Sequence, residues 1–313
     1  MTLRVCDAHC HFFSSRFLDI LIQSAPPGSF AATTFGASPA AGRSSAVAGH
    51  LGWDDPGAVE ALADRWIAEL DRHGIARASL IASIPGDEQS VAAAVRRHPS
   101  RLVGFFMFNP VAPEASSRLA AALADRKLRT IALFPAMHHY RLDDPAVEHV
   151  FEQAADHGAA VFVHCGVLTV GVRKKLGLPS PFDLRLGDPL AAARMAARFP
   201  KVPVIIPHFG AGLFREALMA ADQCPNVHLD TSSSNSWMRY HPGLTLEGVF
   251  RQALAVAGPE RLLFGTDSSF FPRGWQRPIY DAQLQALSAA GATDDAVRSI
   301  VGGNFERLFS DAD

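Results

Sequence analysis

The chain has 313 residues, of which 48% are hydrophobic and 19% are charged, a composition typical of an ordinary globular protein. Its formal net charge of −2 gives no electrostatic reason to expect nucleic acid or an anionic membrane as a partner. The sequence shows no charged-then-apolar leader and no apolar run long enough to cross a bilayer, and its four cysteines do not resemble a disulfide framework, so a cytoplasmic location is expected.

A short apolar run at residues 3–6 predicts a first strand, and Asp7-Ala8-His9-Cys10-His11 follows it. Because side chains alternate along a strand, we expect Asp7, His9 and His11 on one face and Cys6, Ala8 and Cys10 on the other. Two imidazoles at positions i and i+2 can hold a divalent metal at about 2.0–2.1 Å. A pair of histidines in a polar strand end is the alternative interpretation of this motif alone.

Residues 12–56 are rich in Ala, Ser, Gly and Pro and predict a long, irregular loop. The segment leaves the candidate site directly and includes Phe30, Phe35, Leu51 and Trp53. We therefore expect a lid or a subunit contact, which leaves a homodimer open, rather than a disordered linker. The apolar spacing over residues 58–73 then predicts a helix that ends at Gly74.

Strand and helix patterns alternate from there to the end of the chain. Apolar runs predict buried parallel strands at residues 78–84, 102–109, 130–135, 160–164, 202–208, 227–231 and 262–267. Helical patterns follow at residues 88–98, 113–125, 145–157, 189–199, 212–223, 245–257 and 282–290, and residues 294–309 predict a C-terminal helical cap. Eight strands alternating with helices predict one α/β domain over residues 1–313, a (β/α)8 TIM-type barrel.

Three of these apolar runs end in a side chain that can bind a metal or move a proton: His164, His208 and Asp267. In such a barrel, reactive groups lie at the carboxyl ends of the strands, where the following loops form a cup. Each residue alone is also compatible with a hydrogen-bonded bystander or a helix cap. Together with the histidines of the first strand they predict a metal site. Unpaired buried polar groups each cost about 1–3 kcal/mol, so polar groups from four strand ends in one space are hard to explain by packing alone.

The motifs Asp7-Ala8-His9-Cys10-His11, Val163-His164-Cys165-Gly166, Pro207-His208-Phe209-Gly210 and Phe264-Gly265-Thr266-Asp267 resemble the amidohydrolase superfamily. Within it, the chain is similar to the amidohydrolase 2 branch, which includes aminocarboxymuconate-semialdehyde decarboxylase-like proteins. The resemblance runs from residue 3 to about residue 306. It implies that His9, His11, His164 and Asp267 ligate one divalent metal, usually zinc, and that His208 lies beside the metal-bound water or the substrate.

The expected number of metal ions follows from one position at which this sequence differs from the two-metal members of the family. Its two-metal members use a carboxylated lysine at the end of strand four, whereas the run at residues 130–135 has no lysine. We therefore expect a single metal ion. Zinc is the first expectation, and Mn2+, Fe2+ and Co2+ also suit histidine and carboxylate ligands.

The first functional hypothesis is a metal-dependent hydrolase that uses a metal-activated water on a small ester, lactone or amide. Asp267 would act as ligand and proton acceptor, and His208 would polarise the carbonyl oxygen or return a proton to the leaving group. The same residues suit a decarboxylase of an unsaturated or aromatic carboxylic acid. A non-catalytic barrel that binds a ligand is the third hypothesis.

The loops after the strands give weaker signals about the substrate. Arg273, which follows Asp267 closely, is the preferred substrate contact and favours a small, carboxylate-bearing molecule. The basic residues between 167 and 188 predict either a solvated turn or a carboxylate clamp. Asp230 either lines the cup or caps a turn, and His138 and His139 are left unassigned.

Overall fold

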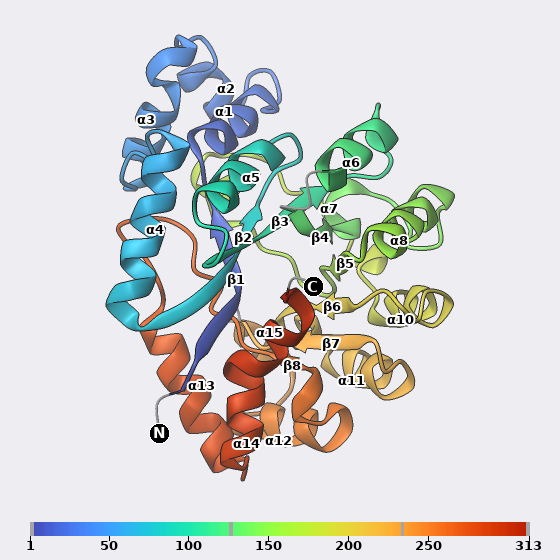
Figure 1. Cartoon of the computed structure of the whole chain (residues 1–313). Coiled ribbons are helices and arrows are strands. Elements are labelled where there is room, and N and C mark those ends of the chain that lie inside the picture. The colour runs from blue at the N-terminus through green and yellow to red at the C-terminus, as the bar shows by residue number, and fades with distance from the viewer. Residues whose placement is uncertain (1–2, 125–127, 233–234, 311–313) are drawn as a thin grey trace.

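Eight parallel strands, hydrogen-bonded in sequence order, form the sheet of this protein (Figure 1). The computed structural model describes residues 3–124, 128–232 and 235–310, so the predicted helix end at residue 125 lies outside it. The strands are β1 Val5–Phe12, β2 Ile75–Ala82, β3 Leu102–Phe108, β4 Leu128–Leu133, β5 Ala160–Val163, β6 Val204–Ile206, β7 Val227–Asp230 and β8 Leu262–Leu263. The barrel prediction is confirmed, but the first strand extends well beyond the predicted residues 3–6.

Helices surround the strands, as Figure 1 shows. Those that follow the strands are α4 Val59–His73, α5 Glu88–Arg97, α6 Ala115–Ala124, α7 Pro135–His138, α8 Pro145–His157, α9 Gly171–Lys175, α10 Pro189–Arg198, α11 Phe214–Gln223, α12 Leu246–Ala257 and α13 Arg277–Ala289. The helix predicted at residues 282–290 was placed too late, because Pro278 is tolerated in the first turn of α13. The sheet is apolar on both faces. The side chains of its outer face pack on these helices, and those of its inner face fill the barrel.

The seam between β1 and β8 closes the barrel by backbone hydrogen bonds that extend past the end of β8. The amide of Ala8 donates to the carbonyl of Phe264 at 2.8 Å, and the amide of Asp267 donates to the carbonyl of His9 at 2.9 Å. The amide of His11 donates to the carbonyl of Ser268 at 2.7 Å. Residues 9 and 267 therefore lie side by side, although the whole barrel separates them in sequence.

The end of the barrel where the strands begin is closed by the C-terminal elements. The predicted cap at residues 294–309 consists of α14 Asp294–Arg298, a π-helical turn at Ser299–Gly303 and α15 Asn304–Phe309. Phe305 and Phe309 of α15 join the apolar cluster inside the barrel, and α15 crosses the barrel axis in Figure 1. A Cβ on Gly302 would lie 2.0 Å from the carbonyl oxygen of Arg4, so only glycine allows this close approach to β1.

The long connection after β1 is present but is not irregular. It contains α1 Ser15–Gln23, α2 Phe30–Phe35 and α3 Ala40–Leu51. The side chains of Ser14 and Ser29 cap α1 and α2 by accepting backbone amide hydrogen bonds, and Gly52 ends α3 in a left-handed conformation. The three helices share an apolar cluster that also includes α9 and is separate from the two clusters of the barrel.

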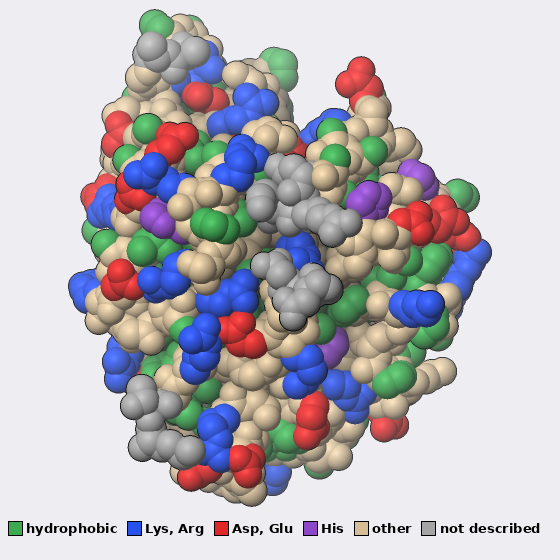
Figure 2. Space-filling view, in the orientation of Figure 1, with side chains coloured by type: hydrophobic (Ala, Val, Ile, Leu, Met, Phe, Trp, Pro, Cys, Tyr) green, Lys and Arg blue, Asp and Glu red, His purple; other side chains and the backbone are tan. Residues whose placement is uncertain are grey.

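The surface agrees with the near-neutral charge of the chain. On the face that shows α15, basic and acidic side chains are intermixed (Figure 2). Among the described residues, every helix is too short or too polar to span a membrane.

A buried polar cluster joins the start of α1 to the start of α5. Asp87 accepts hydrogen bonds from the hydroxyls of Ser14 at 2.7 Å and Ser90 at 2.5 Å, and all three residues are buried. Burial raises the pKa of Asp87 to about 6, despite the two hydroxyl donors. The folded protein therefore holds this proton more tightly than the unfolded chain, whose aspartates titrate near 3.9.

We predict that the ionisation of Asp87 lowers stability as pH rises from about 4 to about 6. Because the pKa in the folded state lies above that in the unfolded state, the stabilisation is complete below pH 4 and is lost above pH 6. The free energy of unfolding is measured with urea at several pH values. Between pH 4 and pH 6 it should fall by on the order of 2 kcal/mol more for the natural chain than for Asp87→Asn. The exposed control Asp156→Asn should show the same pH dependence of the free energy of unfolding as the natural chain. The same pH dependence in Asp87→Asn would contradict the prediction.

Candidate metal site

A bulge in β1 decides which side chains enter the barrel. The pairing of β1 with β2 shifts between Asp7 and Cys10, so that β1 has one extra residue there. Ala8 and His9 consequently both face inward, which strict alternation does not allow. Asp7 points the other way, and the prediction that it shares a face with His9 was wrong. Cys10 lies among the outer core residues, whereas Cys6 lies inside the barrel, so the two thiols do not share a face either.

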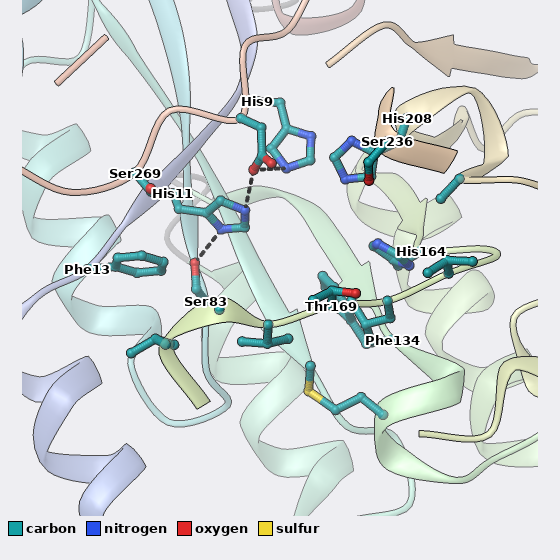
Figure 3. Close-up of a pocket in the computed structure, with 18 of the residues that line it drawn as sticks. His9, His11, Phe13, Ser83, Phe134, His164, Thr169, His208, Ser236 and Ser269 are labelled. Atoms are coloured by element: carbon teal, nitrogen blue, oxygen red, sulfur yellow. Dashed lines mark hydrogen bonds and ion pairs between the residues drawn. The ribbon is translucent and has the colours of Figure 1, made fainter. Parts of the chain in front are cut away.

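His9, His11 and Asp267 meet at the carboxyl ends of β1 and β8. Figure 3 shows the two imidazoles beside each other. Asp267 Oδ1 lies 3.0 Å from His11 Nε2 and 3.7 Å from His9 Nε2, and the three potential ligand atoms lie within 4.8 Å of one another. Asp267 adopts a left-handed conformation with φ of 59°, which aspartate tolerates better than most residues. The structure thus brings together three of the four predicted ligands.

The other nitrogens of the two imidazoles are held by residues behind them. His9 Nδ1 lies 2.6 Å from Asp230 Oδ2, and His11 Nδ1 lies 2.7 Å from Ser83 Oγ. A carboxylate only accepts, and the Ser83 hydroxyl already donates to a backbone carbonyl, so both Nδ1 atoms carry hydrogens. In the neutral rings the Nε2 lone pairs then face the Asp267 carboxylate. Acceptors that face one another need a proton or a metal cation between them, and two imidazoles with one carboxylate are ligands that suit a divalent metal.

Charge and burial act differently on these groups. Burial opposes protonation of His9, but the nearby carboxylates, Asp230 foremost, outweigh it and raise the pKa of His9 to about 8. Burial lowers the pKa of His11. Burial opposes ionisation of Asp267, but contact with His11 and the neighbouring imidazoles hold the pKa of Asp267 well below its usual range. Asp267 therefore remains a carboxylate at neutral pH, and metal binding at His9 competes with protons.

Asp230 and the backbone of residue 265 pack tightly behind His9. A Cβ on Gly265 would lie 2.8 Å from Asp230 Oδ1 and 2.9 Å from the Cβ of His9, so the position requires glycine. Asp230 Oδ1 also accepts the amide hydrogen of Ser232 at 2.7 Å. Asp230 thus caps its own turn and orients His9, and does not line the cavity.

His208 and His164 extend the row of imidazoles beyond His9. The His208 ring lies 5.0 Å from that of His9 and 5.5 Å from that of His164, between centroids. His208 and Phe209 both have left-handed backbones, with φ of 54° and 52°, a conformation that is rare outside functional sites. His164 stacks on Phe134 at 5.2 Å and lies outside the group of three close ligand atoms. Its Nδ1 is buried without a hydrogen-bond partner among the described residues.

A cavity of about 350 Å³ opens above these histidines. One wall is a stack of parallel aromatic rings from the connection after β1 and the loop after Asp267. Phe13 and Trp53 lie 5.2 Å apart, and Trp53 and Phe270 lie 4.4 Å apart. The segment at residues 12–56 therefore forms part of the cavity wall.

Three cationic side chains also line the cavity: Lys175, Arg239 and Arg273. Among the described residues, none of the three forms an ion pair with a carboxylate. Arg273 donates hydrogen bonds to the carbonyl of Asp267 at 2.9 Å and to Ser269 Oγ at 2.8 Å, and it lies over the Phe270 ring. Arg273 therefore places a positive charge beside the aromatic wall of the cavity.

Other predicted contacts lie elsewhere. Only Lys175 of the basic segment reaches the cavity, because Arg173 binds the carbonyl of Pro179 and Arg185 pairs with Asp183. His138 is absent from the cavity lining, and burial lowers its pKa to about 4. Ser233 and Ser234, in the loop after β7, lie outside the described residues.

Sequence reasoning left turn capping open for Asp230, which the structure confirms, but it missed that Asp230 and Ser83 lie behind the histidines. Asp230 is the last residue of β7, so the rule that identified His164, His208 and Asp267 applied to it as well. Ser83, just after β2, had the same position but no distinctive residue type. The aromatic wall had only one signal, the presence of large aromatic residues within a segment of otherwise small ones.

Comparisons with known proteins agree with this architecture. The sequence model of a family described as Amidohydrolase matches residues 6–310. No protein of curated function matches the sequence.

Solved structures of similar fold cover nearly the whole chain. The 5-carboxyvanillate decarboxylase of Sphingomonas paucimobilis is 19% identical, with a TM-score of 0.65 over 99% of this chain and 100% of that one. A 5-carboxyvanillate decarboxylase of Novosphingobium aromaticivorans, with manganese and 3-methoxy-4-hydroxy-5-nitrobenzoic acid bound, is 15% identical, with a TM-score of 0.62 over 98% and 97%. A probable 2-pyrone-4,6-dicarboxylic acid hydrolase of Acinetobacter baumannii, with citric acid bound, is 13% identical, with a TM-score of 0.60 over 99% and 100%. At these identities the likeness concerns the fold.

We predict that Asp230→Asn weakens zinc binding by about 10- to 100-fold, because the asparagine would turn an N–H group toward the hydrogen on His9 Nδ1. Competition with a chromophoric chelator on the metal-free protein measures the affinity, and circular dichroism checks the fold. Asp222→Asn, on the exposed face of α11, is the matched control. Equal affinities for the two variants would contradict a role of Asp230 behind a metal ligand.

Proposed function

The chain belongs to the amidohydrolase family, whose sequence model spans residues 6–310, and from this membership we propose that it is a hydrolase of a small, planar, carboxylate-bearing lactone, ester or amide. The family is one of metal-dependent enzymes. The observation that supports the specific proposal is the convergence of His9, His11 and Asp267 in a cavity with an aromatic wall and three unpaired cations among the described residues.

The proposed metal ligands are His9, His11, Asp267 and His164. His164 suits this role because burial, together with the nearby imidazoles, lowers its pKa well below the usual value and keeps the ring neutral. A divalent cation bound there would lower the pKa of a coordinated water and polarise a carbonyl oxygen. We propose that the site holds a single ion, and zinc is our first choice. Manganese is the second choice, because a 5-carboxyvanillate decarboxylase of similar fold binds it.

His208 and Asp267 are the proposed catalytic residues. Asp267 is ionised and lies at the mouth of the barrel, where it would accept the proton of an attacking water. His208 lines the cavity beside His9, and burial lowers its pKa, so the ring is neutral. A neutral imidazole would donate a hydrogen bond to the carbonyl oxygen, and the proton that Asp267 accepts from the water would pass to the leaving group.

The cavity walls support a planar ring acid as the substrate class. A flat apolar ring would lie against the aromatic wall formed by Phe13, Trp53 and Phe270. A carboxylate would pair with Arg273, whose guanidinium is held in place by the carbonyl of Asp267 and the hydroxyl of Ser269. The names of two structural relatives describe such molecules, 5-carboxyvanillate and 2-pyrone-4,6-dicarboxylic acid.

Decarboxylation of an aromatic or unsaturated acid is the second candidate. Two of the relatives of similar fold are decarboxylases, and the unpaired cations of the cavity suit an aromatic carboxylate equally well. The reaction would replace the C–CO2 bond with a C–H bond, with the proton supplied from the acid and base groups of the site. An assay of the products separates the two candidates.

We predict that the metal-loaded protein releases acid from ring lactones that bear a carboxylate. A pH indicator follows acid release, and a coupled assay follows CO2 from aryl carboxylic acids in parallel samples. Acid release supports the hydrolase, and CO2 release supports the second candidate. Turnover of neutral esters with no activity on either class of acid would contradict the proposed substrate class.

We predict that His208→Ala lowers kcat by about 10²- to 10⁴-fold while the metal stays bound, because the residue contributes acid and base chemistry rather than ligation. Metal analysis of the purified variant and steady-state kinetics test this. His157→Ala, on the exposed surface of α8, is the control. Loss of metal from His208→Ala, or full activity in the reconstituted variant, would count against the assignment.

We predict that Arg273→Gln raises KM for carboxylate-bearing substrates by about 10- to 100-fold, the loss expected for one charge-assisted hydrogen bond. Arg277→Gln, a nearby exposed arginine paired with Asp281, serves as the control. Metal content is measured for both variants, because Arg273 also binds the carbonyl of Asp267. An unchanged KM would exclude Arg273 as the carboxylate contact.

A further inference from the structure

Ser232 lies between two catalytic-site imidazoles. It follows β7 by two residues and is completely buried. Its Oγ lies 2.8 Å from His208 Nδ1 and 3.1 Å from His9 Nδ1. A single hydroxyl thus contacts a proposed metal ligand and a proposed catalytic residue, whose rings Figure 3 shows side by side at the cavity.

The hydrogen on His9 determines what this hydroxyl can do. His9 Nδ1 lies 2.6 Å from Asp230 Oδ2, so it carries a hydrogen and has no lone pair to offer. Ser232 therefore cannot donate to His9 and can only accept a share of that hydrogen. The hydroxyl has one hydrogen of its own, and within the described part of the chain the remaining neighbour at hydrogen-bond distance is His208 Nδ1.

A hydrogen bond from Ser232 to His208 Nδ1 requires a lone pair on that nitrogen. The hydrogen of the neutral His208 ring must then be on Nε2. Nδ1 is covered by buried Ser232, and His208 lines the cavity, so Nε2 is the ring nitrogen left to meet a substrate. The opposite tautomer would have His208 Nδ1–H directed at the hydroxyl or the nearby carbonyl of Ser232. The hydroxyl hydrogen would then have no acceptor among the described residues.

We propose that Ser232 is the positioning residue that fixes the hydrogen of His208 on Nε2. His208 consequently begins each turnover as a hydrogen-bond donor to the substrate, and it can serve neither as a metal ligand through Nε2 nor as the initial base. The role in turnover rests on the proposed function, whereas the position of the hydrogen does not.

Nitrogen NMR on the full-length chain tests the position of the hydrogen directly. The protein is labelled with 15N at the histidine rings, and long-range proton–nitrogen correlations are recorded for the metal-free and the zinc-loaded forms. The His208 signals are identified by their loss in His208→Gln. We expect a protonated Nε2 and an unprotonated Nδ1 in both forms. A hydrogen on Nδ1 of His208 in the natural chain would overturn the proposal.

Variants of Ser232 test whether this residue is the cause. In Ser232→Ala the His208 ring should lose its single tautomer, and Ser232→Thr, which keeps a hydroxyl, should restore it. Ser236→Ala is the matched control, because Ser236 lines the same cavity without a hydrogen bond to either ring among the described residues. An unchanged tautomer in Ser232→Ala would overturn the proposal.

Zinc affinity and kinetics separate this proposal from the proposed function. Ser232→Ala should bind zinc as tightly as the natural chain, and a loss of zinc binding would show that Ser232 acts through His9 instead. With an active substrate, kcat should fall at least about tenfold while KM is unchanged, with a displaced pH profile. If no tested acid is turned over, the NMR experiment alone still tests which ring nitrogen of His208 carries the hydrogen.

Discussion

The seam between the first and last strands is the constraint on which the site depends. β8 is only two residues long, and the barrel is closed beyond it by backbone hydrogen bonds that link His9 to Asp267 and His11 to Ser268. The same hydrogen bonds bring the side chains of His9, His11 and Asp267 together, so the geometry of the candidate metal site depends on closure of the barrel. Asp7 reinforces the seam, because its carboxylate accepts hydrogen bonds from Thr266 of one edge and from the His9 amide of the other.

The site is arranged in two layers that depend on each other. The inner layer consists of imidazoles and one carboxylate, and the outer layer consists of Asp230, Ser83 and Ser232, which determine where the ring hydrogens lie. Fixed tautomers remove the need to reorganise the protein when a cation or a substrate arrives, which is an established source of affinity and rate. The left-handed backbone at His208 and Asp267 aims both side chains into the same space.

Much of this architecture was predictable from local pattern. The alternation of apolar runs and helical patterns predicted the barrel, and polar residues at strand ends predicted that His164, His208 and Asp267 would gather at one mouth. The bulge after Asp7 was not predictable, because it depends on the register between β1 and β2, which no single strand specifies. The helices of residues 12–56 had capping serines and a terminal glycine, and α1 also had a clear apolar periodicity that sequence reasoning overlooked. Small residues hid the periodicity of α2 and α3. The predicted homodimer and cytoplasmic location stay predictions.

The connection after β1 has its own apolar cluster, separate from those that hold the barrel together. Trp53 belongs to this separate cluster, whereas the histidines are fixed by the strands. Substitutions of Trp53 thus act first on the packing of the small helices, whereas Phe13, which stacks on His11, joins that packing to the site. Part of the cavity wall is thus encoded by a helical segment with packing of its own, an arrangement that would let the shape of the cavity change while the barrel stays the same.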